Sequence, residues 1–136
     1  MHLKSQGTLS YPASDFEPMD WLRFIHLAPF DRKWTDLGLD DDDLRALQIM
    51  IMAGPDRFPV VLDTGGLRKI RFGRRGARGK SGGFRIGFAY FPNNAIVLLI
   101  TVFAKNEQSD LSGADRRAIT RIIELIEQQL EQEVIK

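Results

Sequence analysis

Apolar positions in the first part of the chain predict one strand followed by two helices. Trp21–Leu27 is bulky and partly alternating, and because Pro29 follows it, this segment is typical of an edge strand. Phe30–Leu37 predicts a short helix that ends at Gly38. A second helix is indicated by apolar residues at helical spacing, namely Leu44, Leu47, Met50 and Ile51.

Four consecutive aspartates, Asp40 to Asp43, precede this second helix. Carboxylates at a helix N-terminus accept hydrogen bonds from the free amides and interact favourably with the helix dipole. Consecutive side chains on a helix diverge around its axis, so we predict capping here rather than a metal site. Gly54-Pro55 ends the helix.

From residue 60 onward the pattern changes to that of strands. Four short, bulky segments, separated by glycines or by Pro92-Asn93-Asn94, predict a meander of antiparallel strands. These segments are Val60–Leu62, Leu67–Phe72, Phe84–Phe91 and Ala95–Phe103. The last of them is apolar on both faces, which predicts a central strand covered from both sides.

A final helix is predicted by a capping box and by one apolar stripe. Ser112 and Asp115 have the spacing of the box. The stripe consists of Ala118, Ile119, Ile122, Ile123, Ile126 and Leu130. The whole order predicts a small, single α+β domain over residues 21–134, with an antiparallel twisted sheet of about four strands, two N-terminal helices and one C-terminal helix. Residues 1–20 show no sustained period and are predicted to form a loose N-terminal extension.

The composition argues against several classes of protein. The chain has no cysteine, and its two histidines, His2 and His26, are too far apart for a recognisable zinc site. We therefore expect no metal and no small-molecule cofactor. The N-terminus lacks the pattern of a secretory signal, and the longest apolar run, Ala95–Ala104, is too short to span a bilayer. These features predict a cytoplasmic protein without membrane contact.

Charge is distributed unevenly along the sequence. No acidic residue occurs between Asp63 and Glu107, and we call residues 64–106 the acid-free stretch. Its nine basic residues are Arg68, Lys69, Arg71, Arg74, Arg75, Arg78, Lys80, Arg85 and Lys105. The rest of the chain carries ten basic and eighteen acidic residues, so the net charge of +1 conceals two regions of opposite sign. A concentrated cationic surface attracts polyanions, which predicts contact with nucleic acid.

Strand alternation predicts which of these cations lie together. If the apolar side chains of the strands face the core, Lys69 and Arg71 share the opposite face of their strand, and Arg85 of the next strand lies on the same side. Lys105 directly follows the central strand and can reach this surface. The four side chains thus form one predicted concave patch, with the glycine-rich segment 73–83 at its rim.

This glycine- and arginine-rich rim contains Gly79-Lys80-Ser81, which has the ending of a nucleotide-binding P-loop. That motif needs a glycine where Arg74 stands, and it must open a helix, so we reject nucleotide hydrolysis. We interpret the rim as a contact for a phosphate backbone. A solvated loop without a partner is the alternative.

Lysines and arginines can support the cleavage of RNA. The 2′-hydroxyl of the substrate is the nucleophile, so the protein has to move two protons and stabilise the charge on the phosphate. A lysine can act as acid or base where neighbouring cations favour its neutral form, which makes Lys69 and Lys105 candidates. Arg71 and Arg85 are predicted to hold the phosphate oxygens.

Three blocks of the sequence carry a family resemblance: Thr64–Arg71, Gly79–Arg85, and Leu99–Glu107 followed by Asp110-Leu111. Their order and spacing resemble those of the RelE toxin superfamily, in particular its HigB-like branch, over about residues 21–130. The resemblance implies the toxin of a type II toxin–antitoxin system, a metal-independent endoribonuclease (mRNA interferase) that cleaves messenger RNA on the ribosome and so inhibits translation. It also implies a cognate antitoxin, typically one with a helix-turn-helix domain.

Residue by residue, the resemblance implies catalytic roles for Lys69, Arg71, Arg85 and Lys105. RNA-binding roles are predicted for the other cations of the acid-free stretch, which are Arg68, Arg74, Arg75, Arg78 and Lys80. The chain departs from the family at Phe103, where close relatives often carry tyrosine, a residue that helps catalysis elsewhere in the superfamily. Two alternatives stay open: a non-catalytic protein that binds RNA or the ribosome, and a ParE-like inhibitor of DNA gyrase.

Overall fold

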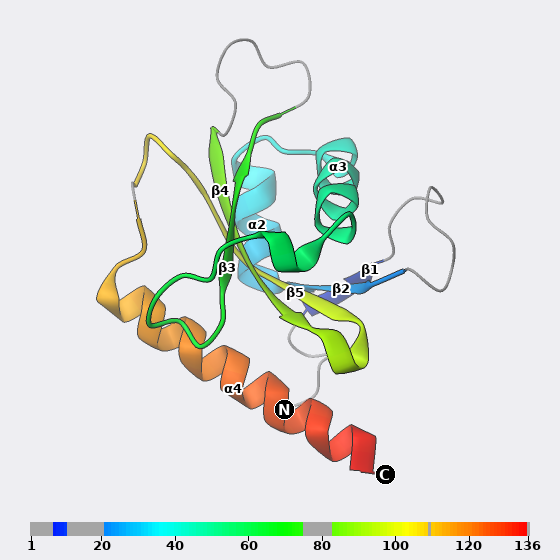
Figure 1. The fold of residues 1–136 in the computed structure, drawn as a ribbon. Helices are drawn as coiled ribbons and strands as arrows, with labels where there is room; N and C mark the ends of the chain where they lie inside the picture. Colours follow the sequence, from blue (N-terminus) through cyan, green and yellow to red (C-terminus); the bar gives the residue numbers. More distant parts are fainter. Residues whose placement is uncertain (1–6, 11–20, 75–82, 109, 136) are drawn as a thin grey trace.

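The computed structural model describes residues 7–10, 21–74, 83–108 and 110–135, and these form one α+β unit (Figure 1). The strands are β1 (Gly7–Ser10), β2 (Arg23–Leu27), β3 (Arg68–Phe72), β4 (Phe84–Phe91) and β5 (Ile96–Ala104). The helices are α2 (Ala28–Asp36), α3 (Asp41–Met52) and α4 (Gly113–Ile135), with short 3-10 turns at Pro55–Arg57 and Pro92–Asn94. The predicted fold class is therefore confirmed.

The five strands form a mixed sheet in the order β1-β2-β5-β4-β3. Three pairings are antiparallel, but β2 and β5 run parallel, with Phe24 opposite Val97. The prediction of a purely antiparallel sheet is wrong in this pairing, because the chain passes through two helices and the β3–β4 hairpin before β5 adds beside β2. The local alternation of apolar residues in β2 does not reveal a pairing with a strand so distant in sequence.

Strand β1 lies at the edge of the sheet and pairs with β2, with Thr8 opposite His26. The strand predicted over Trp21–Leu27 exists, but its prediction as an edge strand is wrong because β1 pairs with its outer side. Pro29, which suggested an edge, lies instead in the first turn of α2, where the missing amide hydrogen costs nothing. Four residues of the predicted N-terminal extension thus belong to the sheet, and the rest of that segment lies outside the described residues.

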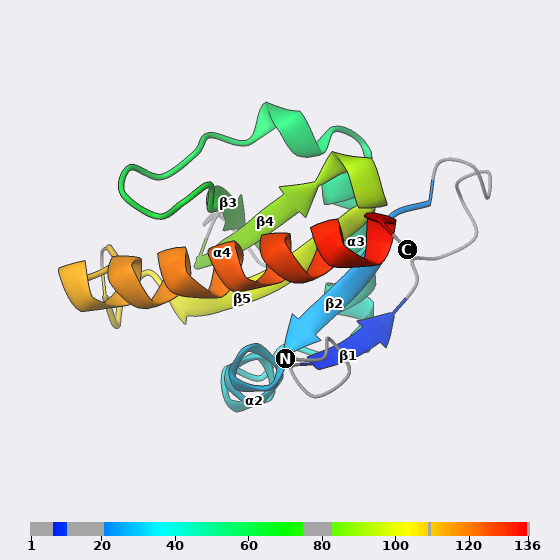
Figure 2. The same ribbon diagram turned by 90° about the horizontal axis from the view of Figure 1, so that it is seen from below.

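Different helices cover the two faces of the sheet. Trp34 of α2 packs against Phe72 of β3, with 5.9 Å between ring centroids, and we call this side of the sheet the α2–α3 face. Helix α4 crosses β4 and β5 on the opposite side, the α4 face, and buries Ile119, Ile123, Ile126 and Leu130 (Figure 2). Leu98 and Leu99 of β5 are fully buried. The prediction of a central strand covered from both sides is confirmed.

Both predicted helix caps are present. The Asp40 carboxylate accepts from the Asp43 amide at 2.9 Å, and the Asp43 carboxylate accepts from the Asp40 amide at the same distance. The Ser112 hydroxyl and the Asp115 carboxylate make the equivalent exchange at the start of α4, at 3.0 and 3.1 Å. In the part of the chain that the structure describes, no helix is long and apolar enough to cross a membrane.

The predicted strand Val60–Leu62 is reduced to a single bridge, Val60 opposite Arg68. Two backbone bonds remain, from the Val61 amide to the Leu67 carbonyl at 2.7 Å and from the Lys69 amide to the Pro59 carbonyl at 3.0 Å. The Thr64 hydroxyl closes the turn between them, because it donates to the Val61 carbonyl at 2.6 Å and accepts from the Leu67 amide at 3.1 Å. Asp63, Gly65 and Gly66 have positive φ angles of 60°, 75° and 119°, which curl the chain into a turn. We call residues 58–67 the edge loop because they precede the edge strand β3.

Candidate functional site

The strand register brings three of the predicted catalytic cations onto the α4 face. Arg71 lies directly opposite Arg85, and Lys69 lies opposite Gly87. Residues that face each other on antiparallel strands have Cβ atoms about 4.5–5.5 Å apart and point to the same side of the sheet. Because Phe72 packs against α2, Lys69, Arg71 and Arg85 must belong to the other face.

Lys105 continues this arrangement beyond the end of β5. Its amide donates to the Gly83 carbonyl at 2.9 Å, which extends the β4–β5 pairing past Phe84 and Ala104. Phe103 lies opposite Arg85, so a residue two positions further along the same ladder faces the same side. Lys105 therefore stands at the end of the α4 face, next to the start of β4.

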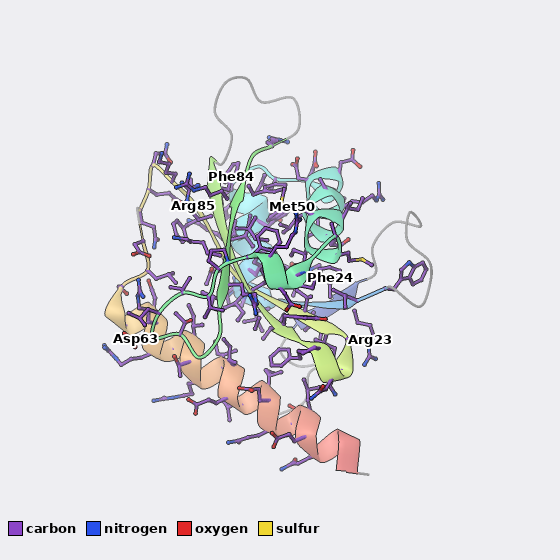
Figure 3. All side chains as sticks on the ribbon, viewed as in Figure 1. Arg23, Phe24, Met50, Asp63, Phe84 and Arg85 are labelled. Atoms are coloured by element: carbon purple, nitrogen blue, oxygen red, sulfur yellow. The ribbon has the colours of Figure 1, made fainter. Side chains whose placement is uncertain are left out.

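A small pocket opens between these strands, and we call it the Arg85 pocket. Its lining includes Lys69, Arg85, Gly87, Thr101, Phe103 and Asp110. Arg85 is buried, with 9% of its surface exposed, and its Nη1 donates to the Phe84 carbonyl at 3.2 Å. In Figure 3 its side chain lies on the side of β4 that faces the segment leading from β5 to α4. Phe103 supplies the aromatic ring of the pocket without a hydroxyl.

Gly87 shapes the floor of the Arg85 pocket. A Cβ at this position would lie 2.5 Å from the Thr101 hydroxyl and 2.9 Å from a methyl group of Leu67. A β-bulge follows at once, since Gly87 pairs with Thr101 whereas Phe88 pairs with Leu99. The absence of a side chain thus lets the neighbouring strands close beneath Lys69.

Lys69 and Arg71 are exposed, and so is Lys105. None of the ion pairs among the described residues involves any of these three cations. Long cationic side chains that are exposed and not paired with a carboxylate are available to an anion from solution. The α4 face at the ends of β3, β4 and β5 is therefore an open cationic surface.

Arg68 has a different environment on the α2–α3 face. Its Nη1 donates to the carbonyls of Phe58 at 2.7 Å and Asp56 at 3.2 Å, and its Nη2 lies 3.8 Å from the Asp56 carboxylate. These bonds tie β3 to the 3-10 turn after α3. The placement supports a structural role rather than the predicted RNA contact.

Arg74, at the end of the described part of the β3–β4 hairpin, is paired with the capping box of α3. Its guanidinium lies 3.2 Å from the Asp43 carboxylate and 3.5 Å from that of Asp40. The bond from the Asp43 amide, together with a smaller contribution from Arg74, holds the pKa of Asp40 below its ordinary value of 3.8. The remaining predicted RNA-binding residues, Arg75, Arg78 and Lys80, lie outside the described residues.

Asp110 is a member of the site for which the sequence predicted no role. The residue lines the Arg85 pocket, and its carboxylate accepts from the Leu111 amide at 2.8 Å and from Arg116 at 3.1 Å. The signal was present in the sequence, since Asp110-Leu111 closes the third block of the family resemblance. Strand patterns could not reveal it, because Asp110 reaches the pocket from the segment between β5 and α4.

Glu107 fixes the turn in which Lys105 lies. Its two carboxylate oxygens accept from the Ala104 amide at 2.9 Å and from Lys33 of α2 at 3.1 Å. The hydrogen bond from the Ala104 amide, with a smaller contribution from Lys33, lowers the pKa of Glu107 below its ordinary value of 4.5. The first acidic residue after the acid-free stretch therefore points away from the cations and towards α2.

No protein-family model matches this sequence. The interpretation of the site consequently depends on its own geometry. In that geometry a small pocket is lined by one exposed cation, one buried arginine, one aromatic ring and one acidic residue, which are Lys69, Arg85, Phe103 and Asp110. Two further exposed cations, Arg71 and Lys105, lie on the same face of the sheet. Such a set can bind a phosphodiester and stabilise additional negative charge on it.

Proposed function

We propose that this protein is an RNA-cleaving toxin of the RelE type, which cuts messenger RNA on the ribosome in the cytoplasm and is neutralised by a cognate antitoxin with a helix-turn-helix domain. The observation that carries the proposal is the direct pairing of Arg71 with Arg85, with Lys69 beside them on the same face. A polyanion is the natural ligand of a surface on which cations are gathered rather than dispersed.

In the proposed reaction the 2′-hydroxyl of the RNA attacks the adjacent phosphorus, and the bond from phosphorus to the 5′ oxygen breaks. The 2′-hydroxyl loses its proton to a base, and the 5′ oxygen receives a proton from an acid. The products are a 2′,3′-cyclic phosphate and a 5′-hydroxyl. Arg71 and Arg85 stabilise the pentavalent phosphate, and Lys69 and Lys105 are the candidates for proton transfer.

The test is cleavage of a defined message on programmed ribosomes, with the cut sites mapped by primer extension. We expect wild-type protein to give specific cuts, and Arg71→Ala to lower the cleavage rate by roughly 100-fold, the usual cost of removing one group that stabilises the transition state. Arg71 is exposed, so the variant should keep the wild-type melting temperature. Arg45→Ala, which removes an exposed arginine from α3, is the matched control and should cleave like wild type.

Phe103 favours a second candidate function, a protein that binds RNA without cutting it. The ring lines the Arg85 pocket but offers no proton for transfer. In that case wild-type protein would bind RNA in a strongly salt-dependent manner and leave messages intact. Phe103→Tyr separates the two candidates, because an added phenol should raise cleavage in a weakly active enzyme and change nothing in a protein that only binds.

A further inference from the structure

A second, wider pocket adjoins the Arg85 pocket at the edge of the sheet, and we call it the edge pocket. It has a volume of about 390 Å³, and its lining includes Val60, Leu62, Lys69, Asp110 and Arg116. Lys69 and Asp110 line both pockets. A phosphate held at Lys69 therefore lies next to the edge pocket.

The edge pocket presents apolar side chains to solvent. Val60 is 54% exposed and Leu62 is 75% exposed, which is more than any other large apolar residue whose side chain the structure describes; the next is Leu125 on α4 at 39%. A single exposed apolar side chain is ordinary, but two beside one pocket mark a surface suited to an apolar ligand face.

The edge loop, which carries these side chains, is held in place by hydrogen bonds within the loop and from helix α4. The Val61 amide donates to the Leu67 carbonyl at 2.7 Å, which ties the edge loop back on itself. Arg116 of α4 donates to the Leu62 carbonyl at 2.6 Å and also binds Asp110. A surface fixed in this way binds a ligand without a large loss of conformational entropy.

Asp110 gives the edge pocket a means of selection. Each of its carboxylate oxygens accepts one hydrogen bond within the protein, from the Leu111 amide or from Arg116, and each has capacity for another. Exocyclic amino groups of nucleobases donate to carboxylates. Adenine, cytosine and guanine carry such a group, whereas uracil does not.

We infer that the edge pocket binds the nucleobase next to a phosphate held on the exposed α4 face at Lys69. The base packs against Val60 and Leu62, and Asp110 selects bases with an exocyclic amino group over uracil. This inference rests on the proposed function, because it takes the ligand to be single-stranded RNA. It adds a specificity-determining residue, Asp110, and an apolar platform to the proposed site.

The test measures binding to three hexanucleotides, oligo-A, oligo-C and oligo-U, by fluorescence anisotropy. Their riboses are 2′-O-methylated so that cleavage cannot interfere. We expect oligo-A and oligo-C to bind about tenfold more tightly than oligo-U, in line with the usual discrimination by one good base contact. Asp110→Asn should bring this ratio close to one, because an amide can donate to the carbonyl groups of uracil.

Leu62→Ser should weaken oligo-A binding by roughly tenfold, as expected when the burial of one leucine side chain against the base is lost. Leu125→Ser is the matched control, since it removes the same side chain from an exposed position on α4 and should change nothing. Both leucines are exposed, so the melting temperatures should stay close to that of wild type.

The possible failures are distinguishable. If all three hexanucleotides bind equally and Arg71→Ala weakens them equally, RNA binding stands and the base pocket is overturned. If Leu62→Ser leaves every affinity unchanged, the apolar surface serves another ligand, such as a protein, and the inference is again overturned. If no hexanucleotide binds, both the proposed function and the base pocket fail. If the wild-type protein leaves messages on ribosomes intact but still binds oligo-A and oligo-C more tightly than oligo-U, the catalytic proposal is contradicted and the base pocket is supported.

Discussion

The cations of the acid-free stretch have opposite environments on the two faces of β3. On the α2–α3 face, Arg68 binds two carbonyls and lies near a carboxylate, and Arg74 beyond the end of the strand is paired with the cap of α3. On the α4 face, Lys69 and Arg71 are exposed and take part in none of the ion pairs among the described residues. Neighbours in sequence thus differ in role because strand geometry sends them to different sides.

This comparison shows why a count of charges overstates a binding surface. The stretch lacks acidic residues of its own, yet Asp40, Asp43 and Asp56 reach it from α3 and the turn that follows. A cation that already pairs with a carboxylate would have to give up that pair to bind RNA. Lys69, Arg71 and Lys105 take part in none of the ion pairs among the described residues, so they avoid this cost.

The largest expected effects come from reversing the charge of one exposed cation on the α4 face, Arg71, and of one cation paired with carboxylates, Arg74. Arg71→Glu puts a carboxylate into the open cationic surface and should weaken RNA binding by roughly 100-fold at low salt. Arg74→Glu puts a third carboxylate beside Asp40 and Asp43, so it should mainly lower stability. Titration with a labelled RNA and thermal unfolding measure the two effects. Equal losses of RNA affinity in both variants would abolish the distinction between the groups.

A smaller effect is expected at the floor of the open surface. Gly87→Ala forces a methyl group against Thr101 and Leu67, so it should lower the free energy of unfolding by about 1–3 kcal/mol, as overpacking usually does. Urea titration measures the loss. Gly83→Ala is the matched control, because a Cβ there meets no atom within 4 Å. Equal stability of the two variants would contradict the close packing described at Gly87.

Arg68→Ala tests the structural role of Arg68, and the expected loss of stability is smaller still. The substitution removes two bonds to carbonyl groups, and it should cost about 1 kcal/mol of unfolding free energy. The salt dependence of RNA binding should not change, because Arg68 lies on the face away from the site. A lower slope of log affinity against log salt in Arg68→Ala would show that Arg68 contacts phosphate after all.

The smallest effect concerns acid pH. The pKa of Glu107 is lowered in the folded protein, so its contribution to stability is fully present above its ordinary pKa of 4.5 and is lost as the pH falls through the lowered value. Glu107→Gln should therefore be slightly less stable than wild type at neutral pH, and the difference should shrink on acidification. Unfolding midpoints of both proteins across this range provide the measurement. A difference that grows towards acid pH would contradict the assigned bonds.

Local signals in the sequence predicted much of the fold. Phe84–Phe91 is a strand with the bounds expected from its bulk and its flanking residues, and the caps at Asp40 and Ser112 form as their spacing indicates. Each of these features is decided within a few residues. The doubly covered strand β5 was equally predictable, because burial from both sides leaves no polar face.

The features that the sequence did not predict all depend on distant parts of the chain. The parallel pairing of β2 with β5 joins residues more than seventy positions apart, and β1 adds to the edge from a segment with no period of its own. In the site, alternation correctly grouped Lys69, Arg71 and Arg85. It could not predict that Arg74 pairs with α3 or that Asp110 lines the pocket, because these contacts arise between layers rather than within a strand.

Cleavage by two variants altered at adjacent residues tests the central claim most directly. Lys69→Ala and Arg68→Ala each remove one cation from β3, on opposite faces of the sheet. With messages on programmed ribosomes, we predict that Lys69→Ala loses roughly 100-fold in cleavage rate and that Arg68→Ala, assayed well below its melting temperature, cleaves like wild type. Loss of cleavage in Arg68→Ala with full activity in Lys69→Ala would contradict the assignment of the α4 face as the catalytic surface.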